Sequence, residues 1–91
     1  MGINELYLTI LNRKNNPAQG SYTSSLLEQG LPRIAQKVGE EGTEVVVAAL
    51  SQDDARLVEE IADLTYHVLV LMAARGIAPQ DVVNELEKRK R

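Results

Sequence analysis

Two pairs of acidic residues, each spaced i and i+3, limit what this chain can fold into. Glu41 and Glu44 form the first pair, Glu60 and Asp63 form the second, and both pairs lie in long stretches of helical periodicity. The segment between them is long enough for a helix end, a short connection and the start of another helix. Two antiparallel helices would bring the four carboxylates together, where they repel one another unless divalent cations lie between them. The leading hypothesis is therefore metal-dependent chemistry on a phosphate substrate.

The remaining sequence has the apolar periodicity and the breaks of a helical protein, with no strand-like alternation. Ser25 with Glu28 resembles a capping box for a short helix that follows a loop through residues 21–24, and Gly30 suits the end of that helix. Pro32 suits the first turn of the next helix. The pattern predicts helices over about 3–11, 25–29, 32–50, 54–75 and from 79 onward. We expect an all-α bundle of four to five helices.

The chain is short enough to form a single small domain over residues 1–91. A core of this size is marginal, so association would help to stabilise it. Residues 68–72 (VLVLM) are apolar on every side of a helix and need cover on every side. We therefore expect a homodimer or a larger assembly; the alternative is a core helix covered within the monomer.

Net charge and composition argue against several classes of partner. The net charge of −3 does not favour nonspecific nucleic-acid binding, and the basic residues 88–91 are interpreted as a solvated helix end. The N-terminus shows no signal peptide, and the longest apolar run is too short to span a bilayer. The absence of cysteine fits a reducing compartment, and we expect a cytoplasmic protein with no membrane and no nucleic-acid partner.

Glu41 is the strongest anomaly, because it falls in the middle of an apolar stripe where a core residue belongs. Glu44 and Lys37 lie on the flank of the same stripe. Charged side chains seldom face a core unless they are paired or bind a metal. Gly39 and Gly42 in the same helix indicate a close helix approach or room for a ligand. The apolar members of the stripe are Ile34, Val38, Val45 and Ala48.

The helix over residues 54–75 repeats this arrangement. Glu60, Asp63 and His67 form a row beside its predicted apolar stripe. Oxygen ligands at i and i+3 suit Mg²⁺ or Mn²⁺ rather than zinc, whereas a lone histidine is more often structural than a ligand. The alternative is that the acids are ordinary surface charges. The predicted apolar stripe consists of Leu57, Ile61, Leu64, Val68 and Leu71.

Two segments resemble the signature of the phosphoribosyl-ATP pyrophosphohydrolase family, which belongs to the all-α nucleoside triphosphate pyrophosphatases. They are residues 37–46 (KVGEEGTEVV) and residues 60–67 (EIADLTYH). Ser21-Tyr22-Thr23, with Leu26 and Gly30-Leu31, resembles the N-terminal region of these enzymes, and the resemblance covers roughly residues 3–90. Gly42 stands where alanine is more usual in the family, and Pro32 where a polar residue is common.

The resemblance implies hydrolysis of phosphoribosyl-ATP to phosphoribosyl-AMP and pyrophosphate, the second step of histidine biosynthesis. It implies Mg²⁺, with Mn²⁺ as a substitute, held by Glu41, Glu44, Glu60 and Asp63 and activating a water molecule. As catalytic residues we expect Glu41, Glu40 as the base or an outer ligand, and Lys37 at a phosphate oxygen. The alternative for Lys37 is a salt bridge to Glu41. The remaining candidates for contacts with the nucleotide substrate are Tyr22, Thr23 and Arg33.

Two other functions fit the same residues. A related all-α pyrophosphatase would act on ordinary or damaged nucleoside triphosphates with the same acids. A helical dimerisation or regulatory module without catalysis would have no need for carboxylates that face a core.

Overall fold

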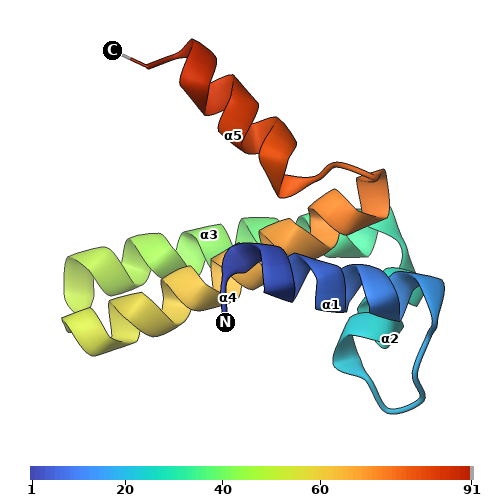
Figure 1. Cartoon of the computed structure of the whole chain (residues 1–91). Helices are drawn as coiled ribbons and strands as arrows, with labels where there is room; N and C mark the ends of the chain where they lie inside the picture. The colour runs from blue at the N-terminus through green and yellow to red at the C-terminus, as the bar shows by residue number, and fades with distance from the viewer. Residues whose placement is uncertain (91) are drawn as a thin grey trace.

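The chain folds into five α-helices in the computed structural model, which describes residues 1–90 (Figure 1). No strand occurs among these residues, so the predicted all-α fold is confirmed. The helices are α1 (Ile3–Asn15), α2 (Tyr22–Gln29), α3 (Leu31–Ser51), α4 (Asp54–Arg75) and α5 (Pro79–Lys88).

Helix α2 begins earlier than the sequence indicated. Ser21 is its N-cap, and the Ser21 hydroxyl accepts a hydrogen bond from the backbone N–H of Ser24 at 3.1 Å. The predicted capping box at Ser25 is therefore wrong, and Tyr22 and Thr23 belong to the first turn of a helix rather than to a loop. Ser21 caps the helix because its hydroxyl accepts from one of the free N–H groups of the first turn. The sequence alone could not choose between Ser21 and the other nearby serines as the cap.

The ends of α3 and α4 follow the predicted signals closely. Gly30, with a φ of +96°, separates α2 from α3, and Pro32 lies in the first turn of α3. Asp53 caps α4 by accepting from the backbone N–H of Arg56 at 2.9 Å. Gly76 ends α4 in the left-handed conformation, which glycine adopts without steric cost.

Helices α3 and α4 form a long antiparallel hairpin, and α1 and α2 cover one end of it (Figure 1). The core lies at this covered end, where α1 packs along the second half of α4. The opposite end of the hairpin projects beyond α1 and α2, and several of its apolar side chains are exposed. The core residues are Tyr7, Ile10, Leu26, Ile34, Leu69, Val70, Met72 and Ala73.

The apolar run at residues 68–72 is largely covered within the chain. Leu69, Val70 and Met72 are buried in the core, while Val68 and Leu71 are half-buried. The expectation that this run needs a second subunit is wrong for its buried members, because α1 lies across this part of α4.

Helix α5 leaves the bundle and carries no buried residue (Figure 1). Its predicted apolar face, Val82, Val83 and Leu86, is exposed, and α5 contacts α1. Among the described residues, no single helix is long and apolar enough to cross a membrane; α4 and α5 meet that criterion only as a pair bent by 103°.

Candidate active site

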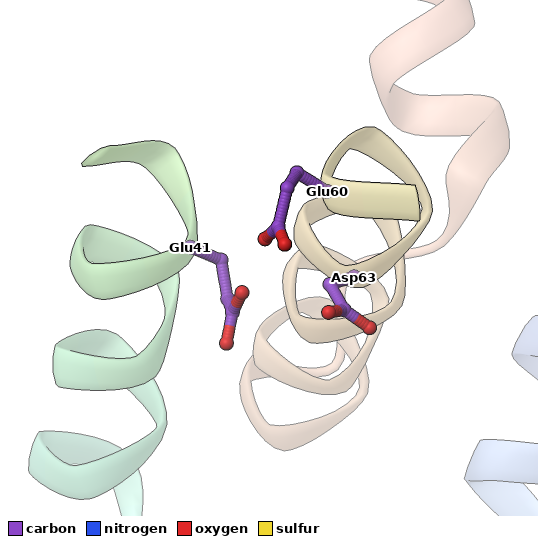
Figure 2. Close-up of side chains that lie close together, drawn as sticks. All are labelled: Glu41, Glu60 and Asp63. Carbon is purple, nitrogen blue, oxygen red and sulfur yellow. The ribbon is translucent and has the colours of Figure 1, made fainter. Parts of the chain in front are cut away.

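Glu41 occupies the buried face of α3, as the periodicity predicted. It is 9% exposed, and it lies on the same face as the buried residues Ile34 and Ala48. The α3 stripe faces α4 along the hairpin, so the Glu41 carboxylate is held between the two helices (Figure 2).

The most buried residues of α4 lie beside the apolar stripe that the sequence suggested, and four members of that stripe, Leu57, Leu64, Val68 and Leu71, are only half-buried. Glu60 and His67 are 7% and 6% exposed, whereas Ile61 is 46% exposed. Helix α4 is therefore rotated so that the row containing Glu60, Asp63 and His67 approaches the neighbouring helices. Polar groups can occupy this face because each buried one has a hydrogen-bond or ion-pair partner.

Three carboxylates meet between α3 and α4. Glu41, Glu60 and Asp63 each offer an oxygen, and these oxygens lie within 4.8 Å of one another. Figure 2 shows Glu41 reaching from α3 toward the two acids of α4. A set of hard carboxylate oxygens on two rigid helices fits Mg²⁺ or Mn²⁺ and lacks the nitrogen and sulfur ligands that favour zinc. Asp63 is the exposed member, so the cluster opens to solvent on its side.

Glu44, the fourth predicted ligand, lies outside this group. It is exposed on α3, one turn beyond Glu41, and it is not among the acids whose oxygens come together. Its position leaves the prediction of a ligand at Glu44 without support from the side-chain geometry.

Each buried glutamate is paired with a cation four residues earlier on its own helix. Lys37 Nζ lies 3.3 Å from Glu41 Oε1, so the alternative predicted for Lys37, a salt bridge, is present. Arg56 donates to Glu60 Oε1 and to Glu59 Oε2, both at 2.7 Å. The charges of Glu59 and Glu60 raise the pKa of Arg56 above its ordinary value. These pairs offset part of the repulsion within the cluster.

Arg56 is a site residue that the sequence interpretation missed. The signal was available, because the i, i+4 spacing of Lys37 and Glu41 recurs in Arg56 and Glu60. The sequence interpretation considered this pairing for Lys37 and Glu41 but did not extend it to Arg56 and Glu60.

Arg33, Lys37 and Glu40 lie together on α3 beside Glu41. Glu40 Oε1 is 3.8 Å from both Arg33 Nη1 and Lys37 Nζ. The structure thus places four predicted site residues side by side on α3, namely Arg33, Lys37, Glu40 and Glu41. The two cations lie next to the carboxylate cluster. Their long exposed or half-buried side chains can turn toward an anionic ligand at little cost.

Tyr22 and Thr23 reach α4 one turn beyond Asp63. The Tyr22 hydroxyl lies 3.0 Å from His67 Nε2, and the Thr23 hydroxyl is hydrogen-bonded to the Tyr66 hydroxyl. His67 in turn lies 2.8 Å from the backbone oxygen of Asp63 through Nδ1. The first turn of α2 is therefore joined to the helix that carries two of the acids.

Comparison with known proteins shows the family of the chain. A profile of the family described as phosphoribosyl-ATP pyrophosphohydrolase matches residues 3–90. The chain belongs to this family. A protein named phosphoribosyl-ATP pyrophosphatase from Sulfurisphaera tokodaii is 54% identical over 87 residues, covering 96% of this chain and 93% of that protein. Proteins of the same name from Saccharolobus solfataricus and Clostridium botulinum are 46% and 49% identical, covering 98% and 97% of this chain and 95% and 80% of theirs.

Membership of the phosphoribosyl-ATP pyrophosphohydrolase family confirms the resemblance seen in the sequence. The departure from the family pattern at Gly42 has no packing reason within the chain. A Cβ atom built at Gly42, or at Gly39, would meet nothing within 4 Å. Within the chain no helix therefore approaches these glycines closely, and the other alternative, open space for a ligand, fits the structure better.

Proposed function

We propose that this chain hydrolyses phosphoribosyl-ATP to phosphoribosyl-AMP and pyrophosphate, as the second step of histidine biosynthesis. The observation that carries the proposal is the carboxylate cluster of Glu41, Glu60 and Asp63 in a chain of this family. A binding module has no use for three acids brought together between two helices, since their mutual repulsion lowers its stability.

Glu41, Glu60 and Asp63 would hold Mg²⁺, with Mn²⁺ as a substitute. Glu44 would join them from the next turn of α3 if its side chain turned toward the cluster. Bound Mg²⁺ would neutralise charge on the phosphates and lower the pKa of a coordinated water molecule. The donor set supports this assignment because all the ligands are carboxylates.

The cations beside the cluster would bind the phosphate chain. Lys37 and Arg33 lie within about one turn of each other on α3, and both can exchange Glu40 for a phosphate oxygen. Glu40, released from these cations, would act as the base that takes the proton of the attacking water, or as an outer ligand. Arg56, held at Glu60, would add positive charge on the α4 side.

The first turn of α2 would contact the base or ribose of the substrate. Tyr22 is 53% exposed although its hydroxyl is held by His67, so one side of its ring remains open. An exposed aromatic ring with a fixed orientation suits stacking against a nucleotide base. Thr23 would contribute from the next position.

We further propose a homodimer in the cytoplasm. The free end of the α3–α4 hairpin exposes apolar side chains that a second subunit would cover, in place of the run at residues 68–72. The exposed apolar residues are Val46, Val47 and Leu50 on α3 and Val58 and Ile61 on α4.

The proposal is tested by measuring pyrophosphate release from phosphoribosyl-ATP with and without Mg²⁺, beside a panel of deoxynucleoside triphosphates. Metal-dependent release with phosphoribosyl-AMP as co-product is expected. Faster turnover of a simple triphosphate would assign the chain to the related pyrophosphatases, and no release from either substrate would favour the binding module.

A further inference from the structure

His67 is a buried polar residue to which the proposed reaction assigns no role. It is the only histidine in the chain and is 6% exposed. Both of its ring nitrogens have partners from different parts of the molecule, Asp63 on its own helix and Tyr22 on α2. Any buried histidine requires partners for its ring nitrogens, but here one of them is the hydroxyl of Tyr22, a candidate substrate contact on another helix.

The partners of His67 fix the direction of the hydrogen bonds. The backbone oxygen of Asp63 can only accept, so Nδ1 must carry the proton that is donated to it across 2.8 Å. In the neutral ring Nε2 is then an acceptor, and the Tyr22 hydroxyl donates to it across 3.0 Å. The result is a chain of two directed bonds that runs from Tyr22 through His67 to the main chain at Asp63.

Aromatic contacts hold the Tyr22 ring in a defined orientation as well. The Tyr22 and His67 rings meet edge to face, with centroids 5.9 Å apart and planes at 81°. Tyr66 packs edge to face against His67 at 5.1 Å and lies 6.3 Å from Tyr22. Because the outer part of Tyr22 stays exposed, this cluster orients the ring without covering it.

We propose that His67 is a positioning residue that holds Tyr22 in place at the edge of the carboxylate site, where Tyr22 binds the nucleotide part of the substrate. This inference rests on the substrate contact proposed for Tyr22. Without the bond to His67, the Tyr22 side chain regains rotamer freedom, and the substrate must order it on binding. The loss therefore falls on substrate binding more than on the chemical step.

Two substitutions of His67 separate the two hydrogen bonds. His67→Asn keeps a donor near the position of Nδ1 but removes the acceptor for Tyr22, whereas His67→Gln places an amide oxygen near the position of Nε2. We expect His67→Asn to raise KM for phosphoribosyl-ATP about three- to tenfold, the effect of one hydrogen bond, with kcat changed less than about twofold. His67→Gln should restore KM to near the wild-type value.

A double-mutant cycle connects the effect to Tyr22. Tyr22→Phe removes only the hydroxyl and should raise KM as His67→Asn does, and the double variant should be no worse than either single variant. Tyr7→Phe, which removes a hydroxyl from the buried core outside the site, is the control and should leave KM unchanged. Additive effects, or equal losses of thermal stability in the Asn and Gln variants with unchanged KM, would overturn the proposal.

A spectroscopic measurement keeps this inference separate from the proposed function. Because the chain has one histidine, ¹⁵N NMR of the imidazole reports the His67 tautomer without ambiguity. Recorded where the ring is neutral, the wild-type spectrum should show the proton on Nδ1, and Tyr22→Phe should shift the Nε2 resonance. A proton on Nε2 would refute the positioning role even in an active enzyme. A wild-type protein that shows the expected tautomer but no turnover would instead refute the proposed reaction.

Discussion

Replacing Asp63 by asparagine is expected to stabilise the metal-free protein and, at the same time, to remove its stabilisation by Mg²⁺. Asp63 contributes one of the three carboxylates of the cluster, and no salt bridge to its side chain is present among the described residues. Glu41 and Glu60, by contrast, are paired with Lys37 and Arg56. Asp63→Asn is therefore the substitution that removes repulsion without breaking an ion pair.

The separation of the oxygens sets the size of the effect. At 4.8 Å, the largest separation within the cluster, two like charges repel by about 0.9 kcal/mol in water and by about 3.5 kcal/mol at an effective dielectric constant of about 20. Asp63 is exposed, and Lys37 and Arg56 offset part of the charge, so a net gain of about 1 kcal/mol is expected. For a chain of this length that gain corresponds to a rise in Tm of about 4–8 °C.

The assay is thermal unfolding followed by circular dichroism at a fixed protein concentration, in EDTA and in Mg²⁺. Wild-type protein should gain about 2.7 kcal/mol when Mg²⁺ is present at about one hundred times its Kd, because the ion binds only the folded site. Asp63→Asn should begin from a higher Tm in EDTA and show a much smaller response to Mg²⁺.

Glu87→Gln is the matched control, because it removes one negative charge from the exposed surface of α5, away from the cluster. It should leave both the Tm in EDTA and the Mg²⁺ response close to those of the wild type. A lower Tm of Asp63→Asn in EDTA would refute the argument from carboxylate repulsion. A full Mg²⁺ response in this variant would show that Asp63 does not belong to the cation site.

Three further predictions follow from the same geometry. Glu41→Gln should abolish pyrophosphate release while helix content by circular dichroism is kept; near-wild-type turnover at saturating Mg²⁺ would remove Glu41 from the site. Gly42→Ala should raise the free energy of unfolding in urea by up to about 1 kcal/mol, because alanine favours the helix and its methyl group meets nothing within 4 Å. A lower free energy of unfolding would show that the methyl group does not fit beside α3. Leu50→Glu and Val58→Glu should dissociate the proposed dimer in sedimentation velocity, since both side chains are exposed apolar groups at the free end of the hairpin; an unchanged sedimentation coefficient would place the interface elsewhere.

The sequence by itself determined the helices and their ends to a large extent. Gly30, Pro32 and Gly76 act through local backbone geometry, which does not depend on tertiary contacts, and the structure places them as expected. The buried face of α3 was also predictable, because its apolar stripe lies on one side of the helix and Glu41 falls within that stripe. The start of α2 was not, because several serines could serve as its cap and only one does.

The tertiary structure decided which side of α4 is buried. Helix α4 has apolar residues on most of its surface, so periodicity alone could not choose between the stripe through Ile61 and the row through Glu60 and His67. The choice depends on long-range partners, with Tyr22 reaching His67 from α2 and Glu41 facing Glu60 from α3. For the same reason, spacing grouped Glu44 with the other acids, while packing brought only Glu41, Glu60 and Asp63 together among the described residues. Sequence spacing fixes positions along one helix, but the rotation of one helix against another is set by the contacts between them.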